Sequence, residues 1–314
     1  MLTTRESCPL CHSLEYARLL ETPYAKPEVL DFLTTYYHRS SRSAMKAHLE
    51  GGTLSIVECS SCHLIYQREI PDEEFMQTIY SDWIVQDDYL SPSAIPLAIE
   101  QYASVAGEVL HLLAEQCQII GTQRRVRVLD YGMGWSAWLQ MARSCGAIVY
   151  GYEVSEPKIQ YARSIGIPVL SADQLSGMQF DIINTEQVFE HVAQPDALLQ
   201  RLMEGLAPTG FLKISVPSGR SIKAVLSGWK WAEAIARTQQ IMPVHPLEHI
   251  NCFRSDVLDR LAARYGLERA RVSVRRAIAL SPGWTGAIGS AKNILRLLYR
   301  FGLRRGTYAL YCRR

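Results

Sequence analysis

The sequence predicts an α/β fold in which a mostly parallel sheet carries helices on its faces. Between residues 125 and 217, short apolar runs alternate regularly with stretches of helical periodicity, and this alternation is typical of βα units. A glycine-rich turn follows the first run, and acidic residues follow the first three runs. Sheets of this kind bind ligands at the carboxyl ends of their strands, so the pattern predicts a ligand site there.

Each element of the sheet region has its own signal in the sequence. Short apolar runs predict strands, while proline or acidic residues at the start of a segment and glycine after it mark helices. The strands are expected at residues 126–130, 147–153, 167–170, 180–184 and 211–216. The helices are expected at 135–144, from Glu156 onward, and at 195–206, where a Pro-Thr-Gly turn follows.

The chain is expected to fall into four consecutive parts. Residues 1–90 form a small cysteine-bearing module, residues 91–122 a connecting helix that begins near Ile95, and residues 123–217 the sheet region. Residues 218–314 form the fourth part. It is predicted to hold an insertion, a helix at 255–265, a strand at 270–277, a basic helix near 291–301 and a final strand at 307–312 that completes the sheet.

The composition is that of an ordinary globular protein: 48% of the 314 residues are hydrophobic, 20% are charged, and the formal net charge is +2. So small a charge argues against nucleic acid as an obligate partner. No window has the run of about 20 apolar residues that a membrane-spanning helix needs, and the first residues lack a signal-peptide stretch. A cytoplasmic protein without a transmembrane segment is expected, and the sequence leaves its oligomeric state open.

The glycine-rich turn has the features of a nucleotide-type site. Asp130 ends the first predicted strand, and Gly132 and Gly134 follow at alternate positions before a helix begins. Glycine lets the backbone turn sharply and a ligand approach closely, while the start of a helix offers free N–H groups. Glu153 ends the second strand about 20 residues later, the offset at which an acid binds a ribose diol. Asp173 follows the third strand.

In this order, these residues resemble the motif series of class I S-adenosylmethionine-dependent methyltransferases. The resemblance covers residues 125–217 and is most specific in Val-Phe-Glu-His-Val at 188–192 and Pro-Thr-Gly at 208–210. It implies a Rossmann-like seven-strand methyltransferase core with Glu153 at the ribose and Asp173 at the adenine of S-adenosylmethionine. The implied cofactor-binding set is Asp130, Gly132, Gly134, Glu153, Asp173 and Glu186.

Trp135 departs from that family, which has a small residue at this place, and its bulk would crowd the methionine end of the cofactor. Two other interpretations stay open: a nicotinamide-dependent Rossmann domain, and an inert fold of the same type used as a scaffold, because fold alone does not prove function. The third glycine of a dinucleotide fingerprint is missing, with Ala137 near its place, which argues against the nicotinamide alternative.

Four of the eight cysteines form two CxxC pairs, Cys8/Cys11 and Cys59/Cys62. Such pairs in a chain with no export signal indicate metal ligands, and four thiolates make a closed tetrahedral site for structural zinc. Free thiols or a redox pair are the alternatives. The two pairs and the sequence of residues 65–80 resemble the zinc-binding N-terminal module of some bacterial methyltransferases, including C-methyltransferases of nucleotide-linked deoxysugars. In those enzymes the module helps to form the substrate cleft.

Methyl transfer to oxygen or carbon needs a group that takes a proton from the acceptor, and histidine titrates in the useful range. The candidates are His191, after the fourth strand, and His245 and His249, in a Pro…Glu-His-hydrophobic-Asn segment that resembles the acceptor-pocket segment of the same methyltransferases. His249 is the preferred base, whereas His191 can equally anchor its loop and His245 can stiffen a turn. The rival groups from the N-terminal module are Tyr36, Tyr37 and His38.

Three further features admit two interpretations each. His12 and His63 follow the cysteine pairs and are either alternate ligands or groups outside the ligand set. Trp229 and Trp231 in the insertion form either a lid over the acceptor or ordinary packing. A basic stretch either touches phosphates or an anionic membrane surface, or is a solvated helix face; it contains Arg296, Arg300, Arg304 and Arg305.

The sequence therefore predicts a methyltransferase that carries S-adenosylmethionine and structural zinc and acts on a small-molecule acceptor. C-methylation of a nucleotide-linked sugar is the leading expectation, from the resemblance alone. O-methylation of a polyketide, quinone or glycan acceptor is the nearest alternative. A different class of function is a non-catalytic or macromolecule-directed binding protein with a zinc module, although few Lys and Arg lie near the CxxC pairs to bind RNA.

Overall fold

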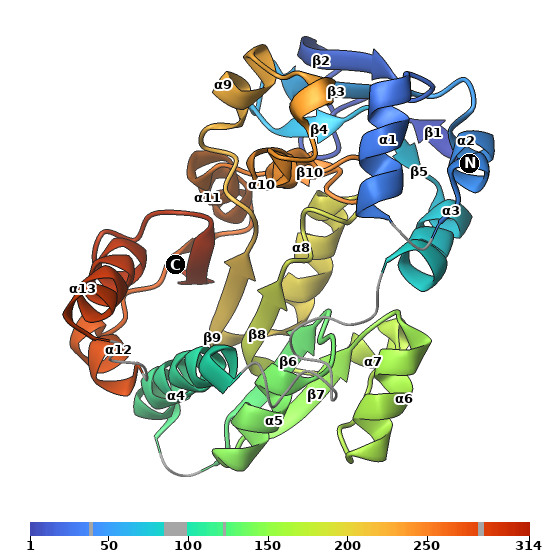
Figure 1. Ribbon diagram of the computed structural model, residues 1–314. Coiled ribbons are helices and arrows are strands. Elements are labelled where there is room, and N and C mark those ends of the chain that lie inside the picture. The colour runs from blue at the N-terminus through green and yellow to red at the C-terminus, as the bar shows by residue number, and fades with distance from the viewer. Residues whose placement is uncertain (38–39, 85–98, 122–123, 282–285) are drawn as a thin grey trace. The chain divides into compact units, whose positions relative to one another are not determined.

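The computed structural model describes residues 1–37, 40–84, 99–121, 124–281 and 286–314 (Figure 1). These residues form two compact units, each built from separate stretches of the chain. None of the helices in the described ranges is both long and apolar enough to cross a lipid bilayer.

The first unit consists of the described residues up to 84 together with Phe189–Leu198 and Val216–Leu261. The second consists of the described residues from 99 to 188 together with Leu199–Ser215 and Ala262–Arg314. Part of the segment 218–314 thus belongs with the N-terminal residues. The compact units do not coincide with the four consecutive parts, whose roles stay a prediction.

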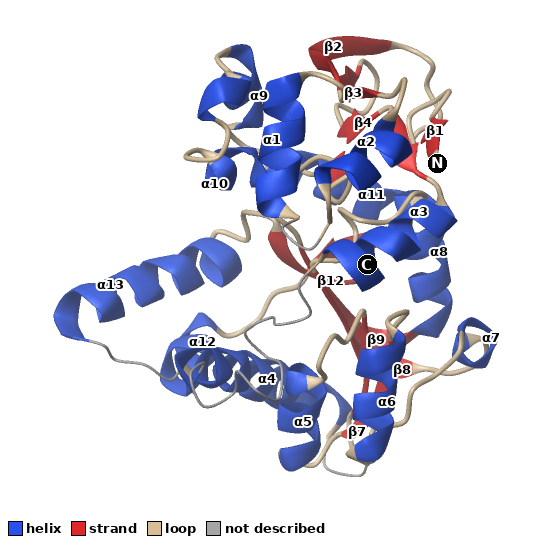
Figure 2. Cartoon of the chain, turned by 45° about the vertical axis from the view of Figure 1, so that its right-hand side comes forward, coloured by secondary structure: helices blue, strands red, loops and turns tan. Residues whose placement is uncertain are grey.

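The second unit is built on a six-stranded sheet with the order β11-β12-β9-β8-β6-β7. Its strands, several of which Figure 2 shows in red, are β6 (Arg127–Tyr131), β7 (Ile148–Tyr152), β8 (Phe180–Glu186), β9 (Leu206–Ser215), β11 (Leu267–Arg269) and β12 (Tyr308–Arg313). The strands β7, β6, β8 and β9 run parallel, whereas β12 is antiparallel to both β9 and β11. Because β6 lies between β7 and β8, the chain reverses its direction of winding there, which confirms the predicted Rossmann-like α/β class.

The third predicted strand, at 167–170, is reduced to a single bridge at the free edge of β7. Val169 pairs in parallel with Gly151, and the N–H groups of Gly151 and Leu170 donate to Pro168 O and Gly151 O. Proline has no N–H to extend such a ladder. The bridge occupies the place of the seventh strand that the sequence predicts, so six continuous strands remain among the described residues.

The predicted strand at 270–277 is wrong, because β11 ends just before it and none of these residues lies in a strand. Pairing with β12 ends at Arg269, and residues Val274–Leu280 form the helix α12 instead. Ser273 caps this helix, because its hydroxyl oxygen accepts a hydrogen bond from Arg276 N at 3.2 Å. A serine at this position satisfies an N–H group that the helix leaves free, which outweighs the alternating apolar residues before it.

An apolar row crosses the parallel part of the sheet. Val149, Val128, Ile182 and Phe211 are register partners on β7, β6, β8 and β9, and all four are buried. They share one core cluster with residues of α4 (Ile99–Ile120), α5 (Ala137–Ser144) and α6 (Glu156–Ser164). The helix α4 lies within the predicted connecting helix, of which residues 91–98 fall outside the described ranges.

Several further helices complete the fold. The second unit holds α7, α12 and α13, and α13 continues into a π-helical turn at Leu298–Gly302. The helices α8 and α11 each carry residues of both units. Their bounds are α7 Ala172–Leu175, α8 Pro195–Gly205, α11 Ser255–Arg264 and α13 Gly286–Leu297.

The first unit contains two small antiparallel sheets with the orders β10-β4-β3-β2 and β1-β5. The strands are β1 (Leu2–Thr4), β2 (Tyr16–Pro23), β3 (Thr53–Cys59), β4 (Ile65–Gln67), β5 (Glu69–Pro71) and β10 (Asn251–Cys252). The helices are α1 (Pro27–Tyr36), α2 (Arg42–Leu49), α3 (Glu73–Thr78), followed by a π-helical turn at Ile79–Trp83, α9 (Ile222–Ser227) and α10 (Thr238–Ile241). A segment from the last quarter of the chain thus supplies the strand β10 to a sheet formed by N-terminal residues.

The two tryptophans of the insertion belong to the packing of the first unit. Trp231 is buried in its core cluster, with its ring 5.6 Å from that of Phe32. Trp229 packs edge-on against Trp231 with ring centroids 5.7 Å apart. These contacts favour the interpretation that the two rings are ordinary packing residues and do not form a lid.

Candidate functional site

The carboxyl ends of the parallel strands bring polar residues together in a second row across the sheet. Gly151, Asp130, Asn184 and Lys213 are register partners on β7, β6, β8 and β9. Each follows a member of the apolar row by two residues, so the two rows lie on the same face. A row of buried charged and amide groups therefore separates the apolar core from the sheet edge.

Asp130 occupies the centre of this polar row, at the point where the winding reverses. Its side chain is buried, and Asn184 Nδ2 donates to Asp130 Oδ1 at 2.7 Å. Burial raises the pKa of the Asp130 carboxyl to about 7, although the hydrogen bond from Asn184 acts in the opposite direction. The carboxyl thus titrates near neutral pH.

Lys213 is held in the same row by two carboxylates. Its Nζ donates to Glu108 Oε1 at 2.6 Å and to Glu186 Oε2 at 2.5 Å. Burial alone would lower the pKa of Lys213, but the charges of the two carboxylates outweigh it and raise that pKa. Glu186, which the sequence places in the cofactor set, also accepts from Ser215 Oγ at 2.8 Å. Its carboxylate therefore holds Lys213 in this structure.

The glycine-rich turn runs beside the end of β7. The N–H groups of Gly132 and Met133 donate to Tyr152 O at 2.8 and 3.1 Å. Gly132 has φ +79°, and a Cβ there would lie 2.6 Å from Val188 Cγ2, so both backbone angle and space require glycine. At Gly134, with φ +52°, a Cβ would meet no atom within 4 Å. The backbone there is open to a ligand.

Glu153 is fixed against this turn by backbone hydrogen bonds. Its Oε2 accepts from Gly134 N at 2.9 Å, and its Oε1 accepts from Val154 N at 2.8 Å and Ser155 N at 3.0 Å. A carboxylate has more acceptor positions than these three bonds use. The structure thus brings Glu153, Gly134 and Gly132 together near Asp130; that they form a nucleoside site stays a prediction.

Asp173 and Trp135 lie at the borders of this edge. Asp173 is exposed in α7, which follows the bridge at Val169 and starts with a capping box between Ser171 and Gln174. The ring of Trp135 packs edge-on against Tyr161 of α6, with centroids 5.5 Å apart. Trp135 is thus held against α6.

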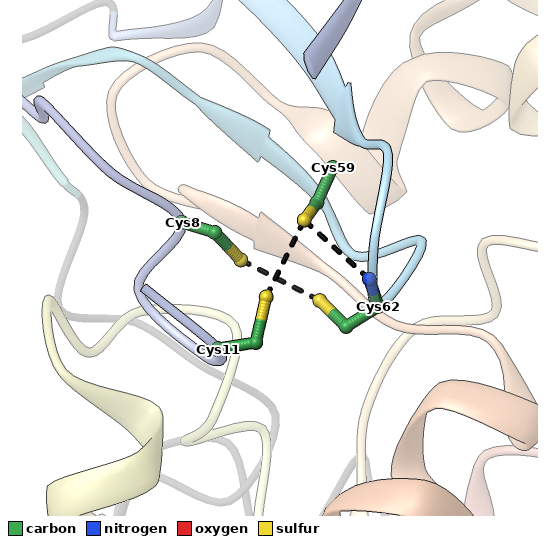
Figure 3. Close-up of side chains that lie close together, drawn as sticks. All are labelled: Cys8, Cys11, Cys59 and Cys62. Carbon is green, nitrogen blue, oxygen red and sulfur yellow. Dashed lines mark hydrogen bonds between the residues drawn. The ribbon is translucent and has the colours of Figure 1, made fainter. Parts of the chain in front are cut away.

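The four paired cysteines converge in the first unit (Figure 3). Cys8 Sγ lies 3.5 Å from Cys62 Sγ, and Cys11 Sγ lies 3.5 Å from Cys59 Sγ. Sulfur ligands about 2.3 Å from a tetrahedral zinc are about 3.8 Å apart. A hydrogen bond from Cys62 lowers the pKa of the Cys8 thiol, which favours a thiolate there. The spacing therefore fits a closed tetrahedral metal site.

Two equivalent turns present these cysteines. Cys8 N and Cys59 N donate to the carbonyl oxygens five residues later, and the N–H groups of His12 and His63 donate back to Cys8 O and Cys59 O. Both histidines have left-handed backbones, with φ of 60° and 61°. His12 and His63 therefore shape the turns, and the four sulfur atoms form the cluster without them.

His191 and His249 lie together in the first unit, with ring centroids 4.7 Å apart. His191 Nδ1 lies 3.1 Å from Glu248 O and 2.8 Å from the Tyr80 hydroxyl, while His249 Nδ1 contacts Met242 O. A carbonyl only accepts, so the contact with Met242 O places the His249 proton on Nδ1 and leaves a lone pair on its Nε2. The carbonyl of Glu248 favours the same tautomer for His191. Burial lowers the pKa of His191 to about 3 and also lowers that of His249, which favours the neutral form of both rings.

His245 has different surroundings from the other two histidines. It is fully buried, with its ring centroid 3.9 Å from that of Tyr36 and 5.5 Å from that of Phe32. Burial lowers the pKa of His245 to about 3. This packing favours the structural interpretation of His245.

Two polar side chains of the N-terminal residues hold the histidine loop: Gln67, which the sequence does not single out as functional, and Tyr37, which it predicts only as a rival base. Gln67 Nε2 donates to His245 O at 2.9 Å and to His249 O at 3.1 Å. Between them Leu247 has a left-handed backbone with φ +73°, which is strained for a leucine. Tyr37 donates to Glu248 Oε1 at 2.6 Å, and burial raises the pKa of Glu248 to about 7.

Long-range pairing explains why the sequence misses Gln67 and the contact that Tyr37 makes. Gln67 and Tyr37 contact groups about 180 and 211 positions away, and Asn184 and Lys213 resemble ordinary strand residues until the register is known. Of the predicted rivals to His249, Tyr36 and Tyr37 are engaged in packing, and His38 lies outside the described ranges.

A family model described as a methyltransferase domain matches residues 99–271. Among curated proteins, the chain is 30% identical over 152 residues to the ubiquinone biosynthesis O-methyltransferase of Chelativorans sp. (strain BNC1) and covers 58% of that protein with 45% of its own length. It is 28% identical over 153 residues to the corresponding protein of Rhizobium etli (strain CIAT 652), with coverage of 60% and 46%. The chain thus spans about three fifths of the length of these relatives.

Among solved structures, the plantazolicin methyltransferase BpumL in complex with SAH is similar, with a TM-score of 0.44 and 16% identity over 75% of this chain and 91% of that one. Magnesium protoporphyrin IX methyltransferase from Synechocystis PCC 6803 with bound SAH has a TM-score of 0.37 and 16% identity, with coverage of 65% and 89%. These TM-scores lie below 0.5, so this likeness assigns neither a ligand nor an activity.

Replacing Asp130 by asparagine tests the buried carboxyl. Its pKa rises from 3.8 to about 7 on folding. Below pH 3.8 the carboxyl is protonated in both the folded and the unfolded state, so it does not affect the free energy of unfolding. Above pH 7 it is charged in both states, and burial of this charge lowers the free energy of unfolding most. We expect Asp130→Asn to increase the free energy of unfolding at pH 8 by about 2–4 kcal/mol and this gain to shrink as the pH falls to 4. Denaturant unfolding of both proteins across this range measures it; a gain that does not change with pH contradicts the assignment.

Proposed function

The chain belongs to the methyltransferase domain family, and from this premise we propose that it transfers a methyl group from S-adenosylmethionine to a small molecule. The observation that carries the proposal is the joint placement of Gly134 and Glu153 beside Asp130 at the carboxyl ends of parallel strands. An open stretch of backbone next to a fixed carboxylate suits a nucleoside, whose ribose hydroxyls donate hydrogen bonds.

The charges of the sheet-edge residues suit S-adenosylmethionine. When bound, the cofactor supplies a methyl group on a positively charged sulfur. We assign Glu153 to the ribose hydroxyls and Asp173 to the adenine amine. Asp130 is a buried carboxyl held by a neutral amide, so a cationic group nearby would stabilise its charged form. Gly132 lets the turn pack against Val188, and Gly134 leaves the backbone open for the ligand.

For the acceptor, we propose an oxygen atom of a quinone-type or similar small molecule. The curated relatives are named ubiquinone biosynthesis O-methyltransferases, and this supports O-methylation more than the C-methylation of a nucleotide-linked sugar that the cysteine module led us to expect. The C-methylation alternative rests on the resemblance of the module alone. A non-catalytic or macromolecule-directed role is the remaining alternative, and a cytoplasmic location stays a prediction.

We propose His249 as the group that takes the proton from the acceptor. Its Nδ1 proton is engaged with a backbone carbonyl, which orients the ring and leaves Nε2 as the free base. His191 has the same arrangement and, through Tyr80, a second hydrogen-bonding partner, which suits a positioning role.

We propose that the cysteine cluster binds one structural zinc ion. Four sulfur atoms from two equivalent turns leave no position open for a substrate, so the ion would stabilise the fold. It would tie residues near the N-terminus to the end of β3.

Cofactor binding tests the proposed nucleoside site. We expect Glu153→Gln to raise the dissociation constant of S-adenosylhomocysteine at least about tenfold, because it removes the charge that accepts the ribose hydroxyls. Glu156→Gln changes a carboxylate whose recorded hydrogen bond is with Gln160 in α6 and should leave binding unchanged. Isothermal titration calorimetry measures both. Normal binding by the Glu153 variant would remove the site assignment, and no binding by the unaltered chain would support an inert scaffold.

Turnover of a panel of acceptors tests the base and the acceptor class. With labelled S-adenosylmethionine, catechols and hydroquinones should be methylated in preference to nucleotide-linked keto-deoxysugars. We expect His249→Gln to lower kcat by about 10²-fold or more and to leave cofactor affinity intact. Preference for the sugars would overturn the acceptor proposal, and an unchanged kcat would exclude His249 as the base.

Metal analysis tests the cysteine cluster. We expect about one zinc per chain in the purified protein and its loss in Cys59→Ser, together with lower thermal stability, because structural zinc contributes folding free energy. Cys145→Ser changes an exposed cysteine outside the cluster and should keep the metal. A fully folded protein without metal would be incompatible with this proposal.

A further inference from the structure

The charges of the chain are strongly segregated along the sequence. Residues 269–314 contain eleven of the 33 Lys and Arg residues and none of the 31 Asp and Glu residues. This segment has a formal charge of +11, and residues 1–268 have −9, which together give the net +2 of the whole chain. The small net charge therefore conceals a strongly basic part of the second unit.

The helix α13 and the π-helical turn after it display apolar side chains within this basic segment. Leu297 and Phe301 are buried and pack with Ala277 and Tyr308. On the outside, large apolar side chains are exposed: Leu295 by 65%, Leu298 by 41%, Tyr299 by 39% and Leu303 by 66%. We call these four residues the outer stripe. Exposed leucines at such spacing are costly in water and usually indicate a partner.

Basic side chains border the outer stripe. Arg296, Arg300 and Arg304 each follow a stripe residue directly, at intervals of four, and Lys292 and Arg305 lie at the two ends. Their hydrogen bonds and ring contact are with uncharged groups: Arg296 donates to Asn293 Oδ1 at 2.6 Å, Arg300 lies 4.2 Å from the Tyr308 ring, and Arg304 donates to Arg269 O at 3.3 Å. Arg296 also lines a pocket with the carboxylate of Glu108, to which Lys213 already donates. These hydrogen bonds and the ring contact therefore leave most of the positive charge beside the stripe without an ion-pair partner.

We propose that the outer stripe and its basic border bind the surface of an anionic lipid bilayer. An interfacial helix combines an apolar face that enters the headgroup region with basic residues that attract anionic lipids. Nucleic acid would use the charges but would leave the leucines exposed, and an acidic protein would need a matching apolar groove. The inference is independent of the proposed methyl transfer, because it uses none of the residues at the sheet edge.

The location of the stripe suits such a contact. Figures 1 and 2 both show α13 lying beside α12, and the buried pair Leu297 and Phe301 anchors the helix from its inner side. Arg304, with φ +51°, ends the helical segment and donates to Arg269 O. The apolar face is therefore presented by a helix that is anchored to the rest of its unit before any membrane is present.

Vesicle binding by the full chain tests the proposal. We expect co-sedimentation with vesicles of equal parts phosphatidylglycerol and phosphatidylcholine to be at least about tenfold tighter than with phosphatidylcholine alone, and to weaken at 0.5 M salt. Two double variants should each weaken vesicle binding about tenfold or more. One is Leu295→Asp with Leu303→Asp, and the other is Arg296→Gln with Arg305→Gln. Matched controls at other exposed positions are Leu14→Asp with Ile119→Asp, and Arg18→Gln with Lys230→Gln; they should bind normally.

Several outcomes would overturn the proposal. Equal binding to both vesicle types, or equal loss in the control pairs, would show that the stripe is not the site. The unaltered chain could instead be a dimer in solution, with the Leu295→Asp, Leu303→Asp variant a monomer and neither protein bound to vesicles. That result would assign the stripe to a second copy of the chain. Thermal unfolding of each variant shows whether it is folded, and the Arg296/Arg305 pair, which leaves the apolar side chains in place, provides an independent test.

Discussion

The second unit depends on two buried ionisable side chains, Asp130 and Lys213, in the middle of its sheet. Because water does not reach them, neighbouring groups must stabilise their charges. Removing one partner from a buried ion pair typically costs about 3–5 kcal/mol. Lys213 therefore has two carboxylates, and Glu108 of α4 also accepts from Trp138 of α5 at 2.9 Å. These bonds tie two helices to the middle of the sheet, directly beneath the edge where the glycine-rich turn lies.

Asp130 meets the same requirement in a different way. Its partner is the neutral Asn184, and its charge remains only partly stabilised, as its raised pKa shows. The same row thus contains one ionised group that is fully compensated and one that is not. The uncompensated group lies next to the open backbone at Gly134, which is where a cationic ligand would be accommodated.

In the first unit, buried histidine rings are also held in place by hydrogen bonds. The loop from His245 to His249 is held through its backbone by the amide of Gln67, and His191 and His249 are held through Nδ1 by carbonyl groups. Each ring is therefore oriented through a backbone carbonyl, which leaves its Nε2 for other contacts; that of His191 lies 4.0 Å from Glu190 Oε1. The strained backbone at Leu247 lowers stability, and strain of this kind is typical of loops at functional sites.

Local patterns in the sequence determined much of this protein: the strands β6 to β9, the glycine turn, and the two CxxC turns all follow from short-range periodicity and residue type. The tertiary structure alone decided which residues meet. Register placed Asn184 and Lys213 beside Asp130, the Ser273 cap turned a predicted strand into α12, and long-range pairing brought Tyr80 to His191. Pairing across a sheet depends on neighbours that are distant in sequence, so no local window contains the information that specifies it.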